Sequence, residues 1–271
     1  MRFDERFEVI AGSVSGRSHA VIGKSNQDAY AGRIDSMGLC SVVCDGCGSG
    51  ARSEVGAALG ARIISEKVLA KIALGESLCD EKTWERIRSE TLEVFGALVQ
   101  NMGEPIARVV AEHFLFTVMG IAVSNEGAVV FGIGDGLFAL NEEITRIGPF
   151  PGNAPPYLGY GLLGEGPAFT IHRTMALDEF ESALVGTDGM VDYLDVVGKS
   201  IPGGRRELVK PLSSFWREDK YFSNADALRR TLWLVNREVQ RPVWNEKRIV
   251  KEAGLLEDDT TLVVVRKRSE Y

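Results

Sequence analysis

The sequence predicts an α+β protein whose sheets are mostly antiparallel. Segments with strand character cluster in the middle of the chain instead of alternating with helices, which argues against a parallel, doubly wound sheet. Helical periodicity is confined to longer segments before and after that cluster. Of the 271 residues, 45% are hydrophobic and 25% are charged, which is the composition of an ordinary globular protein with one sizeable core.

The elements before this cluster begin with a strand over residues 39–45, an apolar run with β-branched side chains. A glycine-rich loop follows at 46–50, and a long helix is predicted from there to a stop at Gly75. Its buried stripe is expected to contain Val55, Leu59, Ile63, Ile64, Val68 and Ile72. A second helix, capped by Asp80, is predicted to run to Gly103. Its buried stripe is expected to contain Trp84, Ile87, Thr91, Phe95, Leu98 and Met102.

The elements from residue 114 onward are mainly strands. We predict them over 114–123, 128–133, 138–146, 168–174 and 183–186, with a hairpin turn at 125–127 and an irregular loop at 148–166. The stretch 189–224 is expected to be irregular. A helix is predicted over 226–239, a short helix is expected to end at Gly254, and the last strand covers 260–267. We expect Trp216, Trp233 and Trp244 to take part in packing within the core or a flap.

Charge and composition exclude several classes of protein. The net charge of −7 argues against sequence-independent binding of nucleic acid, which needs a positive surface. No window approaches the ~18 consecutive apolar residues of a membrane helix, and the N-terminus has no apolar core of a signal peptide, so we expect a cytoplasmic protein. Four cysteines are too few for a disulfide framework and lack the paired spacing of a zinc site, so we expect free thiols.

Aspartates stand at the ends of several predicted strands. Asp45, Asp135 and Asp188 each end an apolar run and precede glycine, and the pair Asp258 and Asp259 leads into the last strand. Asp-Gly is common in hairpin turns, but Asp45 precedes a glycine loop and a helix. Stiff strands could hold such carboxylates close together, and their mutual repulsion would then be relieved by a divalent cation.

The kind of cation follows from the available ligands. With three histidines and no suitable set of cysteines, the ligands would all be oxygen atoms, which favours Mg²⁺ or Mn²⁺ over Zn²⁺. Because glycine lets the backbone approach a metal closely, the carbonyl group of Gly46 is a further candidate ligand. A pair of such ions could activate a water molecule and bind a phosphoryl oxygen.

Five motifs in order resemble those of one enzyme family. They are NQDA at 26–29, VCDGCGSG at 43–50, GIGDG at 132–136, GTDGM at 186–190 and EDDTTLVVV at 257–265. Together they are similar to the metal-dependent type-2C protein serine/threonine phosphatases, in particular the bacterial-style branch. The resemblance implies a four-layer αββα sandwich, formed by a single domain over residues 1–271 with a variable flap around 189–225.

The resemblance also implies a site at one edge of the paired sheets. Asp45 would bridge two Mg²⁺ or Mn²⁺ ions, the Gly46 carbonyl would bind one of them, and Asp188 and Asp258 would hold the other. Asp28 would orient metal-bound water. A metal-bridging water would then attack the phosphorus of phosphoserine or phosphothreonine in a protein substrate. In many members a third ion is bound with the help of the aspartate that matches Asp135.

Three positions depart from the family pattern. Gln27 stands where the fuller signature has glutamate, and Cys47 stands where some relatives have histidine. Gly23 stands where an arginine usually binds the substrate phosphate. Lys24, His19 or Arg17 could supply that positive charge instead. These departures also fit a different function, namely a degenerate member that binds phosphorylated partners without hydrolysing them.

Two other readings start from the segment around Asp45. The glycines at 46 and 48 with Ala51 fit a relaxed dinucleotide-binding fingerprint, with Glu66 about twenty residues on. Asp45 would then put a negative charge beside a pyrophosphate, and the chain lacks the βαβ alternation of that fold. Cys44 and Cys47 form a C-x-x-C pair that suggests thiol redox chemistry, but the aspartate between them opposes thiolate formation.

Overall fold

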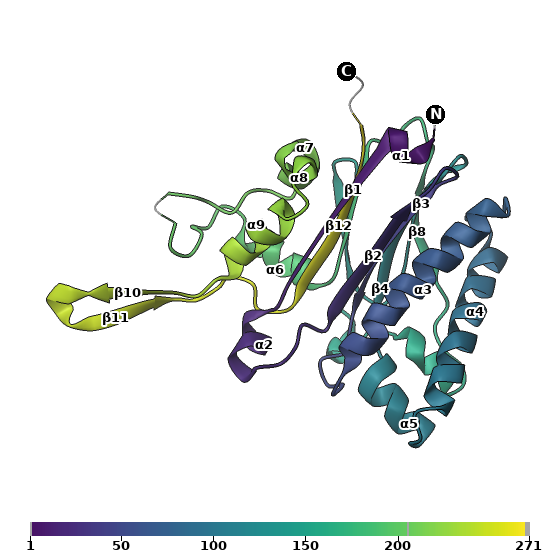
Figure 1. Ribbon diagram of the computed structural model, residues 1–271, viewed down its shortest axis with the longest axis horizontal. Coiled ribbons are helices and arrows are strands. Elements are labelled where there is room, and N and C mark those ends of the chain that lie inside the picture. The colour runs from purple at the N-terminus through teal and green to yellow at the C-terminus, as the bar shows by residue number, and fades with distance from the viewer. Residues whose placement is uncertain (1, 205, 269–271) are drawn as a thin grey trace.

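Two antiparallel sheets stacked between layers of helices make up the protein. The computed structural model describes residues 2–204 and 206–268. Each of the two large sheets has five strands, and helices cover the outer face of both (Figure 1). The four-layer αββα sandwich expected from the sequence is confirmed. Within the described residues, no helix is both long and apolar enough to cross a membrane.

The first sheet joins the two ends of the chain. Its strand order is β1 (Phe7–Val14), β12 (Thr260–Lys267), β9 (Ser182–Gly186), β6 (Gly136–Leu140) and β7 (Glu143–Ile147). Four helices pack on its outer face: α6 (Gly189–Val196), α7 (Ser214–Arg217), α8 (Lys220–Ser223) and α9 (Ala227–Asn236). The last strand is predicted correctly from the sequence, and it lies in the interior of this sheet.

The second sheet contains two long strands that are buried throughout. Its order is β2 (Asp28–Ile34), β3 (Leu39–Asp45), β4 (Val118–Ser124), β5 (Gly127–Ile133) and β8 (Thr170–Met175). The helices α3 (Ser53–Ala73) and α4 (Glu81–Gln100) cover its outer face, followed by α5 (Ile106–Val109) and a π-helix, η1 (Val110–Phe114). Every residue of β4 and β5 is buried because both faces of these strands are covered.

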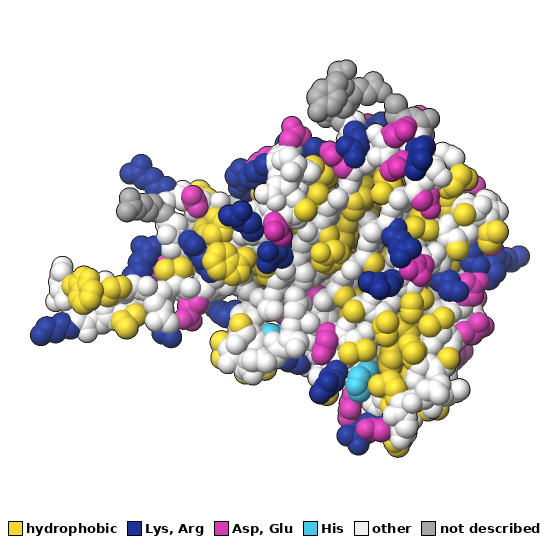
Figure 2. All heavy atoms as spheres, in the orientation of Figure 1, with side chains coloured by type: hydrophobic (Ala, Val, Ile, Leu, Met, Phe, Trp, Pro, Cys, Tyr) yellow, Lys and Arg dark blue, Asp and Glu magenta, His cyan; other side chains and the backbone are white. Residues whose placement is uncertain are grey.

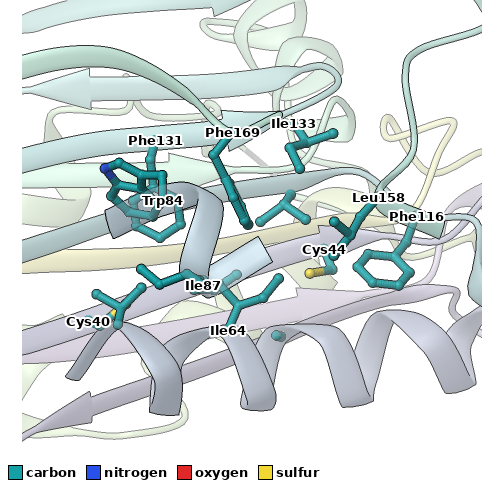
Figure 3. Close-up of a cluster of buried hydrophobic side chains, with 14 of the residues drawn as sticks. Cys40, Cys44, Ile64, Trp84, Ile87, Phe116, Phe131, Ile133, Leu158 and Phe169 are labelled. Atoms are coloured by element: carbon teal, nitrogen blue, oxygen red, sulfur yellow. The ribbon is translucent and has the colours of Figure 1, made fainter. Parts of the chain in front are cut away.

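Aromatic side chains fill the layer between α3, α4 and the second sheet (Figure 3). The indole of Trp84 lies 4.3 Å from the ring of Phe131, centroid to centroid, and its Nε1 donates a hydrogen bond of 2.7 Å to the Leu78 carbonyl. Cys44 is buried in this same layer. Successive side chains of a strand point to opposite faces, so Cys44 points into this core and Asp45, the last residue of β3, points to the other side.

Only the start of helix α3 departs from the apolar stripe expected from the sequence, because Ile64, Val68 and Ile72 farther along that stripe are buried as predicted. Val55 at the start of that stripe is exposed, whereas Gly56, Ala57, Gly60 and Ala61 are buried. Small residues are needed here because neighbouring atoms approach the helix closely. On α4 the predicted stripe is right as far as Phe95, and then Val99 is buried in place of Leu98 and Met102.

Several predicted elements in the second half of the chain are wrong. Residues 138–146 fall within the hairpin β6–β7 rather than one strand, and 189–224 contains three helices. The predicted helix ending at Gly254 is instead a hairpin of β10 (Val239–Val243) and β11 (Arg248–Glu252), joined by the 3₁₀ turn η4 (Trp244–Glu246). Pro242 lies inside this segment, and proline has no N–H for a helical hydrogen bond.

Elements not anticipated from the sequence surround the edge where β3 ends and β12 begins. They include β1, β2 and the helix α2 (Arg17–Ile22), which follows β1 directly. Short elements complete the chain: α1 (Phe3–Arg6), η2 (Pro151–Asn153) and η3 (Leu158–Leu162). Of the three tryptophans expected to pack, Trp216 is buried, but Trp233 and Trp244 are exposed.

Candidate metal centre

Four of the predicted aspartates come together at one edge of the sandwich. Asp28 opens β2 and Asp45 closes β3, and the two residues are directly paired across these antiparallel strands. Asp188 follows β9, and Asp258 lies two residues before β12. The strands β9 and β12 are neighbours in the first sheet, whereas β2 and β3 belong to the second. Each sheet therefore contributes two carboxylates to the same edge.

The four carboxyl groups of this cluster influence one another's charge. Burial raises the pKa of Asp45 well above its usual value, and repulsion from Asp28, Asp188 and Asp258 raises it further. Burial and the charge of Asp258 raise the pKa of Asp188 to about 7. The pKa of Asp28 is likewise raised by burial. Without a cation, the cluster therefore favours bound protons over negative charge.

Asp135 joins the cluster from a different direction. It lies where the chain crosses from β5 in one sheet to β6 in the other. Its side chain is buried, which raises its pKa, and its charge adds to the repulsion felt by Asp188. The structure thus brings Asp135 next to Asp188, as the Asp-Gly pattern suggested.

The donor atoms suit hard divalent cations. All the clustered side chains are carboxylates, and one buried oxygen, Oδ1 of Asp28, has no hydrogen-bond partner among the described residues. An unpaired buried carboxylate oxygen is costly unless a cation or a water molecule satisfies it. Oxygen-only sites of this kind favour Mg²⁺ or Mn²⁺.

Two residues that were not identified from the sequence hold predicted site residues in place. The hydroxyl of Thr187 donates a 2.8 Å hydrogen bond to Oδ2 of Asp28 and accepts one from the Thr261 amide. Asp192, on α6, accepts hydrogen bonds from the amides of Glu257 and Asp258 at 3.1 and 3.3 Å. Thr187 belongs to the GTDGM motif and follows β9 of the first sheet, whereas Asp28, which it contacts, opens β2 of the second sheet.

Asp259, which the sequence indicated only as the neighbour of Asp258, also holds part of the site in place. Its Oδ1 accepts from the Gly16 amide at 2.7 Å, and its Oδ2 accepts from the Gln27 amide at 2.6 Å and lies 2.8 Å from Nδ1 of His19. Within the part of the chain that the structure describes, His19, Asp258 and Asp259 are the one group of three potential ligands whose atoms lie within 4.8 Å of one another. Because Asp259 already accepts from several donors, its carboxylate serves as an anchor for the segment 16–27.

The candidate cations for substrate phosphate all lie near the cluster, but each has a partner within the chain. His19 is held by Asp259, and Arg17 forms an ion pair of 3.4 Å with Glu257. The ammonium group of Lys24 donates to the carbonyl of Gly48, in the glycine loop that follows Asp45. Lys24 is thus connected to the loop that carries Gly46.

The Gln27 side chain faces the start of α3. Its Nε2 donates to the Gly50 carbonyl at 3.1 Å and to the hydroxyl of Ser53. Its Oε1 is buried and has no hydrogen-bond partner among the described residues. The amide that replaces the family's glutamate therefore fastens the glycine loop to the first turn of α3.

Two glycines of the motifs are required by close packing. A Cβ added to Gly46 would lie 2.7 Å from the Ser53 hydroxyl and 2.8 Å from the Gln27 carbonyl. A Cβ added to Gly189 would lie 2.1 Å from the carbonyl oxygen of Asp259. Gly46 therefore lets the loop after Asp45 approach Gln27 and the start of α3, and Gly189 lets the loop of Asp188 approach the segment that carries Asp258.

The structure does not agree with the two other interpretations of the segment around Asp45, a dinucleotide-binding unit and a thiol redox pair. Both large sheets are antiparallel, so a dinucleotide-binding βαβ unit is wrong. Cys44 is buried in the core, which raises its pKa, whereas Cys47 lies in the glycine loop, and both thiols are free. Partial burial raises the pKa of Cys47, but hydrogen bonds from Ser49 and Tyr157 outweigh this effect and lower it overall. Tyr157 was not identified from the sequence.

Comparisons with known proteins agree with this geometry. A family model described as protein phosphatase 2C matches residues 15–151, just over half of the chain. A bacterial serine phosphatase that carries a point mutation has a similar structure, with a TM-score of 0.55 and 13% identity over 97% of this chain and 99% of that one.

Two further solved structures are similar to a comparable extent. The photosystem II phosphatase PBCP gives a TM-score of 0.53 with 15% identity over 97% of this chain and all of the other. The serine/threonine phosphatase Stp1 from Staphylococcus aureus gives 0.51 with 14% identity over 97% and 96%. A search of curated protein sequences found no match. At these identities the structural likeness shows the fold.

Proposed function

Because this chain belongs to the protein phosphatase 2C family, a family of metal-dependent enzymes, we propose that it hydrolyses phosphoserine and phosphothreonine in phosphorylated proteins. The catalytic unit in this proposal is a single domain over residues 1–271. One observation carries it: Asp45 is paired with Asp28 across β2 and β3, and burial together with the charges of Asp28 and Asp188 raises the pKa of Asp45, although the three residues come from distant parts of the sequence and from both sheets. A cluster of this kind needs cations to be stable in its charged form.

Each carboxylate has a separate part in the proposal. Asp45 would contact two Mg²⁺ or Mn²⁺ ions, the Gly46 carbonyl would bind one, and Asp188 and Asp258 would bind the other. Asp135 contributes to a third, weaker site. When bound, these ions supply an activated water molecule as the nucleophile and offset the charge of the phosphoryl group.

The remaining groups orient the reactants. Asp28 is fixed by the Thr187 hydroxyl and directs a water molecule toward phosphorus. Lys24 and His19 are the proposed contacts for the substrate phosphate in place of the family's arginine. Lys24 has the stronger support, because its ammonium group already contacts the loop between Asp45 and α3.

An assay of phosphate release tests the proposal directly. We expect hydrolysis of p-nitrophenyl phosphate and of phosphoserine and phosphothreonine peptides with Mn²⁺ or Mg²⁺, loss of hydrolysis with EDTA, and recovery when Mn²⁺ is restored. Asp45→Asn, Asp188→Asn and Asp258→Asn should each lower kcat by several orders of magnitude. Asp178→Asn, a substitution of an exposed aspartate away from the cluster, is the matched control and should leave kcat unchanged.

Two results would overturn the proposal in different ways. Near-normal rates in the three variants at saturating Mn²⁺ would reject the assigned ligands. Binding of Mn²⁺ in calorimetry without any turnover would instead identify a non-catalytic module that binds phosphorylated partners, the function that Gln27 and Gly23 also fit.

A further inference from the structure

The hairpin β10–β11 forms an arm, residues 239–252, that extends away from the sandwich (Figure 1). In the described part of the chain, its two strands form a sheet of their own and pair with no strand of the two large sheets. An isolated two-stranded hairpin is only marginally stable in water. The presence of an exposed arm of this length therefore indicates a function of its own, outside the sandwich.

The outer part of the arm presents apolar side chains to solvent. Trp244, in the turn, is 81% exposed, and Ile249, on β11, is 64% exposed. Figure 2 shows hydrophobic and basic side chains together at the outer end of the arm. Exposed tryptophan beside exposed aliphatic groups is typical of a surface that becomes buried on binding another protein.

The charge of the arm is opposite to that of the whole chain. Residues 239–252 contain four Lys or Arg and two Glu, a net charge of +2, in a protein whose net charge is −7. Arg241 and Lys251 have exposed side chains, in ion pairs of 3.6 Å with Glu252 and Glu238. The complementary partner is therefore an acidic polypeptide that carries an apolar side chain.

The base of the arm is attached to the edge that carries the carboxylates. Five residues separate the end of β11 from Asp258. Asn236, at the end of α9, donates to the Ser15 carbonyl at 2.7 Å and accepts from the Leu256 amide at 2.9 Å. These bonds connect the base to the segment just before α2, and Figure 1 shows α2 and the base of the arm at the same edge.

We propose that this arm docks the phosphoprotein substrate, by packing Trp244 and Ile249 against an apolar side chain in an acidic segment of that substrate. This inference rests on the proposed phosphatase function and adds a recognition surface outside the metal centre. A five-residue strand is about 17 Å long, so the docked segment lies well away from the phosphorylated residue. Small phosphoesters cannot reach the arm and the metal centre at once.

The separation of the two surfaces gives a sharp kinetic test. The double substitution Trp244→Ala and Ile249→Ser should raise KM for phosphorylated casein, an acidic phosphoprotein, by about tenfold. It should leave kcat for casein and both constants for p-nitrophenyl phosphate unchanged. The control is Leu74→Ala, which removes an exposed apolar side chain at the end of α3 and should change none of these constants.

A binding measurement keeps the inference testable apart from turnover. In an Asp45→Asn background, fluorescence anisotropy of labelled phosphocasein should report binding that weakens with added NaCl and with Lys251→Glu. If the native protein and the double variant bind and hydrolyse casein equally, the docking role is wrong.

Other outcomes would assign the arm a different role. If the native protein is a dimer in sedimentation and the double variant is a monomer, the arm binds a second copy of the chain instead. If binding depends on the arm but no substrate is hydrolysed, the proposed phosphatase function fails and the docking surface remains.

Discussion

Asp259 illustrates how one residue can organise a site without being a predicted ligand. Its carboxylate receives the amides of Gly16 and Gln27 and the ring of His19, which together fix the segment between β1 and β2. That segment ends at Asp28, the first residue of β2. The position of Asp28 beside Asp45 therefore depends on a residue at the far end of the chain.

Asp259→Asn should destabilise the protein by about 2 kcal/mol, the cost of losing hydrogen bonds to a buried charged acceptor. The new amide would place its own N–H groups against the donors of Gln27 or His19. Urea denaturation followed by circular dichroism measures the change in the free energy of unfolding. Asp226→Asn, at an exposed position, is the control, and an equal midpoint for both variants would contradict the anchoring role.

At the scale of residues, a local sequence signal indicates the clustered carboxylates but not the residues that hold them in place. Asp45, Asp135 and Asp188 were found because each follows an apolar strand and precedes glycine, which is a local signal. Thr187 and Asp192 carry no such signal, because their importance lies in contacts with Asp28 and with the backbone at Asp258. Such contacts exist only once the two sheets are stacked.

The first half of helix α3 packs differently from expectation, whereas its second half buries Ile64, Val68 and Ile72 as predicted. A Cβ added to Gly60 would lie 2.5 Å from the ring of Phe116, and one added to Gly56 would lie 2.1 Å from the His113 carbonyl. The first half of the helix therefore meets η1 and the following segment through a glycine seam, and Val55 is exposed while Leu59 is partly buried against the core.

Gly60→Ala and Gly96→Ala should shift stability in opposite directions. Alanine favours a helix by about 1 kcal/mol over glycine, and Gly96 on α4 has no neighbour closer to an added Cβ than 4.0 Å, so that substitution should stabilise. At Gly60 the overlap with Phe116 should outweigh this gain and cost about 1–3 kcal/mol. Thermal unfolding of both variants measures the signs, and stabilisation by both would contradict the close packing of α3 on Phe116.

Element boundaries were predictable where the local pattern and the burial agree. The strand Leu39–Asp45 and the final strand Thr260–Lys267 are continuous apolar runs covered on both faces, and both were predicted with the observed limits. The arm was not, because most residues of its two strands are exposed and burial imposes no apolar pattern on them. Its strand pairing comes from the hydrogen bonds of β10 with β11 and from the turn at Lys247, which has a positive φ of 46°.

At the scale of the molecule, the sandwich holds like charges together. Rigid strands from two sheets bring Asp28, Asp45, Asp188 and Asp258 to one buried edge, and the packing energy of the three core layers opposes their repulsion. The architecture could be expected from the clustering of strands and from the family resemblance. The strength of the repulsion could not, because it depends on how deeply the edge is buried.

The stability of the metal-free protein should therefore fall as the pH rises from about 4 to 7. The pKa of Asp188 is raised to about 7 in the folded state, against about 3.9 in an unfolded chain. Between these values the folded state binds more protons than the unfolded state, so the free energy of unfolding decreases with pH. In EDTA, the thermal midpoint should be lower at pH 8 than at pH 5.5.

Substitution and metal binding separate this effect from the titration of other groups. Asp188→Asn removes the group that must lose its proton, so the drop in the midpoint between pH 5.5 and pH 8 should be smaller in this variant. Saturating Mg²⁺ should reverse the trend in the unsubstituted protein, because cations bind the deprotonated carboxylates and stabilise the folded state by mass action. If the metal-free protein gained stability up to pH 8, the clustered carboxylates would not repel one another as the buried edge requires.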